Sequence, residues 1–138
     1  SRTPWMFLDK AASRNTLIAN INRKLFKKSM SDITALQKEA LAFRDARDWA
    51  QFHNAKDLAT GLSIEASELL ECFLWKDAKS ADPAKIREEI ADVLVYALLL
   101  AHEAKIDIPS AVREKLAKNA IKYPVEKAKG RADKYDQL

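Results

Sequence analysis

The sequence has few of the residues that turn-rich, disulfide-bonded or membrane-spanning proteins use. Its 138 residues include two glycines, four prolines and one cysteine. The single cysteine, Cys72, excludes an intramolecular disulfide and a cysteine-based zinc cage, and we interpret it as a packing residue. The longest uncharged apolar run, residues 93–101, is too short to span a bilayer. We therefore expect a cytoplasmic protein with no membrane partner.

Positive charge is concentrated at one end of the chain. The net charge is +4, but residues 1–29 carry seven basic side chains against Asp9 alone, so residues 30–138 sum to −2. A basic pI indicates nucleic-acid binding only when the folded domain itself is basic, so we expect no nucleic-acid partner. Because Met30 resembles a natural start, residues 1–29 are interpreted as a basic extension, either an arm, a tail or non-native sequence. An amphipathic helical pattern runs through residues 17–25.

Abundant alanine, leucine, lysine and glutamate favour an all-α fold for residues 30–138. Asp82 followed by Pro83 is a strong helix start signal, and Pro124 ends the last helix because the residue before a proline avoids the α region. The predicted helices cover about residues 31–47, 54–75, 83–104 and 108–123, and an irregular tail follows. Short connections favour a four-helix-bundle type, completed by a partner chain in a homodimer or homotetramer.

Two pairs of carboxylates are the most informative feature. Glu65 with Glu68, and Glu89 with Asp92, are each spaced i, i+3, so one helix face presents both members of a pair. Asp92 is the only charged residue in the apolar stretch 90–101. A buried carboxylate is unfavourable unless a cation or strong donors compensate it. We predict that the four carboxylates converge on a divalent metal ion.

Oxygen-only ligands favour a hard cation, Mg²⁺ or alternatively Mn²⁺, and Mg²⁺ shares its coordination with substrate phosphates. The expected chemistry is phosphoryl or nucleotidyl transfer. Two other interpretations of these acids compete with this one. A di-iron centre needs Glu-x-x-His pairs, and no glutamate stands three residues before His53 or His102. Otherwise the acids are solvated helix faces that pair with Lys or Arg, which suits Asp92 poorly.

A second polar set lies near the end of the chain. Lys115, Asn119 and Lys122 fall on one helix face, with Tyr123 adjacent. Two cations and an amide can hold an anionic polyphosphate, although a solvated basic face is the simpler interpretation of a lysine-rich helix.

Aromatic residues stand on both sides of the first acidic pair. Trp49 and Trp75 can stack on a base, and His53 can hydrogen-bond one, although core packing is the usual role of tryptophan. Tyr96 follows Asp92 by one helical turn, so its hydroxyl is placed to support the metal site.

These motifs, in this order, resemble the MazG-like nucleoside triphosphate pyrophosphohydrolases, most closely the dCTP pyrophosphatase branch. The matching residues are Glu65-x-x-Glu68, Glu89-x-x-Asp92, Arg47-Asp48-Trp49-x-x-Phe52-His53, Leu74-Trp75-Lys76, Asp92-Val-Leu-x-Tyr96, Lys115-x-x-x-Asn119-x-x-x-Tyr123-Pro124 and Lys134-Tyr135. The resemblance covers roughly residues 33–136. It implies an all-α catalytic domain with active sites formed in an oligomer, and Mg²⁺-dependent hydrolysis between the α- and β-phosphates to a nucleoside monophosphate and pyrophosphate.

The resemblance also implies roles for individual residues. The four carboxylates would hold Mg²⁺. The phosphates would contact Lys115, Asn119 and Tyr123. The nucleoside would contact Trp49, His53 and Trp75. One carboxylate, a glutamate of the first pair, would orient the attacking water. One position departs from the dCTP branch, which commonly has a histidine in the first helix where this chain has Ala40. Base selectivity is therefore expected to be relaxed or shifted.

The resulting hypothesis is a house-cleaning nucleotide pyrophosphohydrolase that prefers deoxynucleoside triphosphates such as dCTP. Two alternatives remain: a related phosphoribosyl-ATP or dUTP pyrophosphohydrolase, and a non-catalytic helical interaction module that retains the fold.

Overall fold

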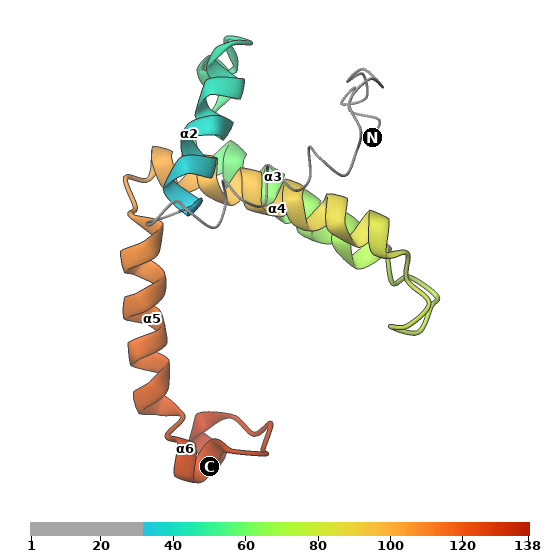
Figure 1. Cartoon of the computed structure of the whole chain (residues 1–138), viewed down its shortest axis with the longest axis vertical. Coiled ribbons are helices and arrows are strands. Elements are labelled where there is room, and N and C mark those ends of the chain that lie inside the picture. Colours follow the sequence, from blue (N-terminus) through green and yellow to red (C-terminus); the bar gives the residue numbers. More distant parts are fainter. Residues whose placement is uncertain (1–31) are drawn as a thin grey trace, which may run out of the picture. The chain divides into compact units, whose positions relative to one another are not determined.

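A computed structural model of the chain describes residues 32–138. The predicted extension over residues 1–29 and its amphipathic segment lie outside these residues. The described residues contain helices and turns and no strand. The elements are α2 (Asp32–Asp45), η1 (Trp49–Phe52), α3 (Ala55–Glu71), α4 (Pro83–Glu103), α5 (Ile108–Lys122), α6 (Val125–Ala128) and η2 (Tyr135–Gln137) (Figure 1). The predicted all-α fold class is confirmed.

Three of the helices begin at a side-chain cap. The Asn54 side chain accepts a hydrogen bond from the Asp57 amide at 2.9 Å, and the Asp82 carboxylate accepts one from the Ala84 amide at 2.9 Å. Asp107 caps α5 in the same way. Each cap satisfies a backbone N–H that has no partner inside the helix. The starts of α3, α4 and α5 are therefore set by local chemistry.

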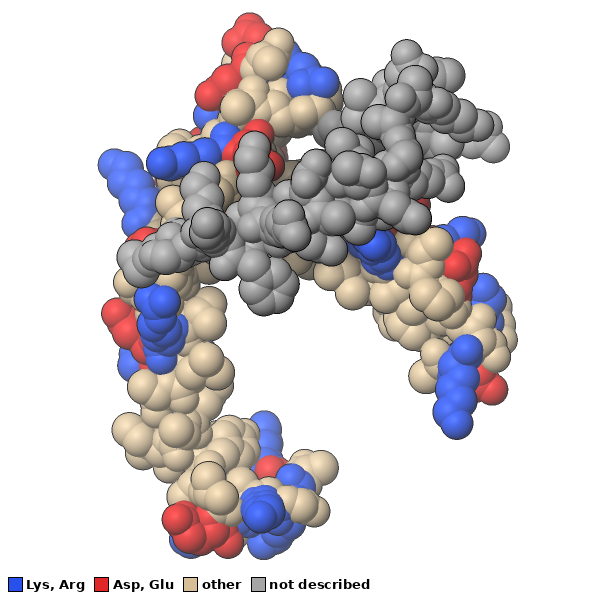
Figure 2. Space-filling view, viewed as in Figure 1, with Lys and Arg blue, Asp and Glu red and all other residues tan. Residues whose placement is uncertain are grey.

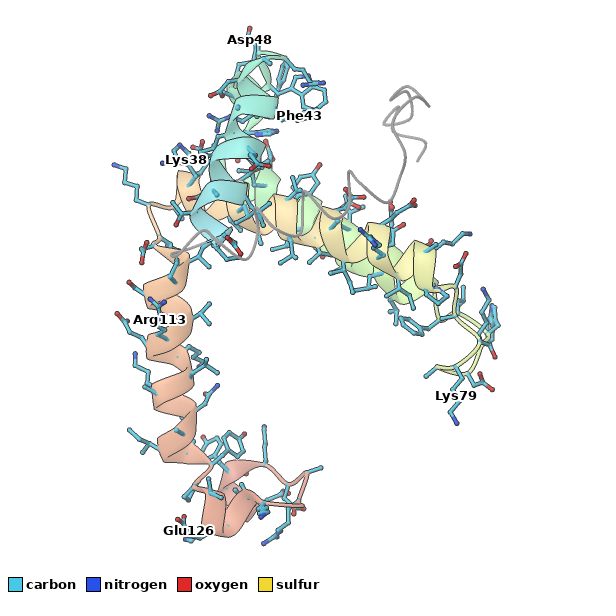
Figure 3. The ribbon with its side chains drawn as sticks, viewed as in Figure 1. Lys38, Phe43, Asp48, Lys79, Arg113 and Glu126 are labelled. Atoms are coloured by element: carbon cyan, nitrogen blue, oxygen red, sulfur yellow. The ribbon has the colours of Figure 1, made fainter. Side chains whose placement is uncertain are left out.

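The structure corrects two details of the predicted elements. We expected Trp75 on the second helix, but α3 ends at Glu71 and Trp75 lies in the turns that follow, with a left-handed backbone φ of 58°. Lys79 marks this connection in Figure 3. The tail after Pro124 is not wholly irregular, because it contains α6 and η2.

The core lies between α3 and α4, which run side by side and form the one extensive helix–helix contact within residues 32–138 (Figure 1). Leu58 of α3 and Leu98 and Leu99 of α4 are buried there.

The first described helix is joined to the end of α4 by polar contacts. Gln37 donates a hydrogen bond to the Leu98 carbonyl at 2.9 Å. The buried Arg44 pairs with Glu103 at 3.1 Å and with Asp45 at 2.8 Å. The last turn of α2, which leads into η1, is therefore held against α4.

Helix α5 has a large exposed apolar side. Val112 and Leu116, one helical turn apart on this side, are 50% and 61% exposed. In Figure 2 the charged side chains of α5 gather on one side of the helix, and uncharged residues form the other side. Burying such a surface is favourable, but nothing in residues 33–138 covers it extensively. The predicted homodimer or homotetramer stays a prediction. Across the described residues, no helix combines the length and hydrophobicity of a membrane span.

Candidate metal centre

Three of the four predicted carboxylates come together across the α3–α4 contact. Glu65 of α3 and Glu89 and Asp92 of α4 each offer an oxygen, and these oxygens lie within 4.8 Å of one another. Glu89 and Asp92 are three residues apart, so α4 presents both on the face that packs against α3. All three residues are half-buried. Side-by-side packing of two helices thus builds a compact oxygen-only group.

The fourth carboxylate, Glu68, lies beside this group without belonging to it. Burial raises the pKa of Glu65, Glu89 and Asp92, and the Glu68 charge is the next largest cause of the raised pKa in each. Glu68 is therefore close enough to repel all three groups. A cluster of four mutually repelling carboxylates favours the binding of a cation.

The residues present fit a divalent metal ion. Within residues 32–138, no lysine or arginine forms an ion pair with any of the four carboxylates. The Oε2 atom of Glu89 is buried and has no hydrogen-bond partner among the described residues. A buried carboxylate oxygen without a donor is unfavourable, and a bound cation would satisfy it. The oxygen-only donor set suits Mg²⁺ or Mn²⁺.

Tyr96 borders the carboxylate group, as its spacing from Asp92 predicts. Burial raises the pKa of the Tyr96 hydroxyl, and the charges of Glu65, Asp92 and Glu68 raise it further. The ring packs so closely on Gly61 that a Cβ added there would lie 2.7 Å from Cδ1 of Tyr96, well inside normal carbon–carbon contact.

Gly61 is a residue that sequence reasoning missed. It lies one helical turn before Glu65, and Tyr96 lies one turn after Asp92. The contact between Gly61 and Tyr96 is therefore next to the carboxylate group along the α3–α4 interface. The lack of a side chain at Gly61 lets the tyrosine occupy this position. The available signal was an isolated glycine inside a helical pattern, which is unfavourable without a packing reason.

The three aromatic candidates lie at the two ends of α3. Trp49 begins η1 and packs edge-on against Phe43, with ring centroids 5.7 Å apart. Phe43 and Asp48 mark this end of α2 in Figure 3. His53 is half-buried, and its Nδ1 atom has no hydrogen-bond partner in the part of the chain that the structure describes. Trp75, beyond the other end of α3, is 94% exposed.

The second predicted set lies on and just after α5. Lys115 is exposed, Asn119 is half-buried, and Lys122 and Tyr123 lie against Tyr135 of η2. In the described part of the chain, no hydrogen bond or ion pair joins these residues to the carboxylates, and α5 makes no extensive contact with α3 or α4. Residues 32–138 of one chain therefore do not bring the two sets together.

Residues 61–138, which include the whole carboxylate group, match the MazG-like family, and the chain belongs to this family. The similarity extends to named relatives in other organisms. The chain is 36% identical over 118 residues to dCTP pyrophosphatase 1 of Bos taurus and 37% identical over 118 residues to that of Mus musculus. In both cases the match covers 80% of this chain and 68% of the relative.

A solved structure, a pyrophosphatase from Archaeoglobus fulgidus DSM 4304, is 37% identical to this chain and superposes with a TM-score of 0.63. The match covers 70% of this chain and 96% of that chain. The family membership that the motifs predicted is confirmed by these matches.

Proposed function

We propose that this MazG-like nucleoside triphosphate pyrophosphohydrolase hydrolyses the bond between the α- and β-phosphates of deoxynucleoside triphosphates such as dCTP, and that it requires Mg²⁺. The products would be a nucleoside monophosphate and pyrophosphate. One observation carries the proposal: Glu65, Glu89 and Asp92 place three carboxylate oxygens within 4.8 Å of one another, and no cationic side chain neutralises them in the described residues. The pyrophosphatase relatives support the reaction class.

The carboxylate group is proposed to hold the metal. Glu65, Glu89 and Asp92 supply hard oxygen ligands from two helices that pack together. When bound, Mg²⁺ supplies positive charge that stabilises the charge developing on the phosphate oxygens and promotes deprotonation of a water. Because the pKa values of the three carboxyl groups are raised, protons compete with the metal up to a higher pH than they would at ordinary carboxyl groups.

Glu68 is proposed to orient the attacking water. It neighbours the three-carboxylate group but lies outside it, so its oxygens are available to accept a hydrogen bond from a water beside the metal. Such positioning brings the nucleophile near the phosphorus with little loss of entropy in the reaction step.

Tyr96 is proposed to contribute a hydrogen-bond donor. Its pKa is raised by burial and by the carboxylates, so the phenol remains protonated under physiological conditions. A neutral hydroxyl at the edge of the group can donate to a carboxylate or to a phosphate oxygen.

The nucleoside is proposed to contact Trp49, His53 and Trp75. The indole of Trp75 is almost fully exposed and can stack on a base, and the free Nδ1 atom of His53 can form a hydrogen bond to one. The resemblance of the chain to dCTP pyrophosphatases supports a pyrimidine deoxynucleotide. Because Ala40 replaces a histidine that is common in that branch, we expect other bases to be accepted as well.

The phosphates are proposed to contact Lys115, Asn119, Lys122 and Tyr123. These residues are separated from the carboxylates within one chain, and the apolar side of α5 is exposed. A second copy of the chain would cover that apolar side and add its helices to the site. We therefore propose a homodimer or homotetramer that acts on the cytoplasmic nucleotide pool and has no nucleic-acid partner.

The test is pyrophosphate release from a panel of ribo- and deoxynucleoside triphosphates, with Mg²⁺ and with EDTA. We expect release only with Mg²⁺, a monophosphate as co-product, and the highest kcat/KM for a deoxynucleotide. Glu88→Gln is a matched control for Glu89→Gln, because Glu88 is the adjacent acid on α4 and is exposed. Glu89→Gln should abolish turnover, whereas Glu88→Gln should retain at least about half of the wild-type kcat.

Other outcomes would replace the proposal. Orthophosphate as the first product would mean that a different phosphate bond is cleaved. Turnover restricted to phosphoribosyl-ATP or dUTP would assign the chain to that related chemistry. Binding without turnover on any nucleotide would identify a non-catalytic helical module.

A further inference from the structure

The chain folds back on itself after α5. The segment after Pro124 forms α6, turns at Gly130 and returns to the end of α5 through η2 (Figure 1). Gly130 has a left-handed φ of 76°, which glycine adopts without strain. We call residues 124–138 the C-terminal return.

Arg131 holds the C-terminal return closed. Its Nε atom pairs with Asp133 at 2.8 Å, and its Nη2 atom donates a hydrogen bond to the Gln137 carbonyl at 3.5 Å. Its backbone amide donates to the Ala128 carbonyl at 3.1 Å. Arg131 thus connects both sides of the turn, through its backbone amide before Gly130 and through its side chain after it, so Tyr135 has a defined position rather than that of a free terminus.

Tyr135 contacts two of the residues proposed to bind the phosphates. Its ring lies edge-on to the Tyr123 ring, with centroids 6.0 Å apart and an interplanar angle of 84°. The Nζ atom of Lys122 lies 5.0 Å from the centroid of the Tyr135 ring. Both geometries are attractive: the first is a T-shaped aromatic pair and the second a cation–π contact. Tyr123 and Tyr135 remain 37% and 48% exposed, so a ligand can reach them.

We propose that Tyr135 is a positioning residue for the triphosphate, acting largely through Lys122. A free lysine side chain samples many rotamers, and ordering it when the substrate arrives opposes binding. Contact with Tyr135 restricts Lys122 before the substrate arrives, and the same ring fixes Tyr123. The C-terminal return therefore prepares the end of α5 to receive an anionic polyphosphate. This inference rests on the proposed function, because it assumes that the end of α5 contacts the phosphates.

The test compares Tyr135→Ala and Tyr135→Phe in the full chain, with pyrophosphate release from dCTP and Mg²⁺ as the readout. We expect Tyr135→Ala to raise KM about three- to fivefold, the size of one exposed cation–π contact, and to leave kcat within about twofold. Tyr135→Phe keeps the ring and should restore the wild-type KM. Lys118→Ala removes an exposed lysine from the same helix without touching Tyr135, and should leave KM unchanged.

A double mutant separates positioning from a general structural role. If Tyr135 acts largely through Lys122, Tyr135→Ala should raise KM by less than half as much in a Lys122→Ala background as in the wild type. A wild-type KM in Tyr135→Ala, or KM effects that multiply in the double mutant, would overturn the inference. A fall in kcat and thermal stability with KM unchanged would also overturn it, because that pattern indicates a purely structural role.

Failure of the proposed function would look different, because the wild type itself would release no pyrophosphate. In that case, calorimetric titration with inorganic pyrophosphate and Mg²⁺ still tests the inference. Wild-type binding that Tyr135→Ala weakens and Tyr135→Phe preserves would support it. Absence of wild-type binding would overturn it together with the phosphate-binding role of α5.

Discussion

Replacing Asp92 by asparagine should stabilise the metal-free protein while abolishing its Mg²⁺-dependent activity. The substitution keeps the shape of the side chain and removes one negative charge. Asp92 forms no ion pair in residues 32–138, so no attraction is lost. Its oxygen lies within 4.8 Å of oxygens of Glu65 and Glu89, so two close repulsive pairs are removed, together with the repulsion between Asp92 and Glu68.

The size of the effect follows from Coulomb's law. Two unit charges separated by the 4.8 Å limit repel by about 3.5 kcal/mol at an effective dielectric constant of 20, and by about 0.9 kcal/mol in bulk water. The three carboxylates are half-buried, and solvent screens them, so each pair lies near the lower value. Removing two pairs should therefore raise the free energy of unfolding by about 2 kcal/mol, which raises Tm by roughly 5–10 °C in a domain of this size.

The same repulsion predicts the pH dependence of stability. The pKa values of Glu65, Glu89 and Asp92 are raised in the folded state above the ordinary values of 4.5, 4.5 and 3.8. The folded state therefore binds protons more tightly than the unfolded state. Their contribution to stability is largest below the ordinary pKa values and is lost as pH rises through the raised values. In EDTA, the Tm of the wild type should fall as pH rises through this range, and Asp92→Asn should show a smaller fall.

The assay is thermal unfolding followed by far-UV circular dichroism, in EDTA and in Mg²⁺, between about pH 5 and about pH 8. Mg²⁺ should raise the Tm of the wild type, because a ligand that binds only the folded state stabilises it, and should have little effect on Asp92→Asn. Glu88→Gln serves as the control for removal of an acid from α4. A Tm in EDTA that is several degrees lower for Asp92→Asn than for the wild type would refute the reasoning, because it would show that Asp92 makes a stabilising contact.

Four further predictions test other parts of the structure. Glu65→Gln should abolish Mn²⁺ binding measured by electron paramagnetic resonance, whereas Glu68→Gln should retain binding but lower kcat by about 100-fold; equal loss of binding would make Glu68 a metal ligand. Trp75→Gly should raise KM across bases more than it lowers kcat, and an unchanged KM would remove Trp75 from the nucleotide site. The same substitution should raise the free energy of unfolding in urea by about 1 kcal/mol, because glycine adopts the left-handed backbone conformation of residue 75 without strain. Arg44→Ala should lower the free energy of unfolding in urea by about 2–4 kcal/mol, since it leaves Glu103 without its partner, and a loss below about 0.5 kcal/mol would contradict this. Deleting residues 1–29 should leave pyrophosphate release intact, and an inactive product would show that this extension supports assembly or the site.

The sequence predicted the helices well where their ends depend on neighbouring residues. Asp82 and Pro83 start α4 where the cap pattern placed them, and α5 ends before Pro124. The sequence predicted the segments that follow a helix less accurately. Trp75 was expected on the second helix, but α3 ends four residues earlier, and the tail contains α6 and η2. The positions of such turns depend on contacts between residues that are distant in the chain or on backbone conformations that side-chain patterns do not encode.

The carboxylate pairs also combine a feature that local sequence determines with one that tertiary packing determines. Spacing alone determined that Glu89 and Asp92 share a helix face, because helical periodicity is a local property. Only the packing of α3 on α4 decided that Glu65 joins them and that Glu68 lies beside the group.

The sequence by itself therefore determined the all-α class, most helix ends and the family motifs. All of these depend on residue type and short spacing. Tertiary structure alone decided which carboxylates converge, that Gly61 makes room for Tyr96, and that Tyr135 returns to the end of α5. Each of these is a contact between residues far apart in the chain, and its geometry depends on how side chains pack across an interface.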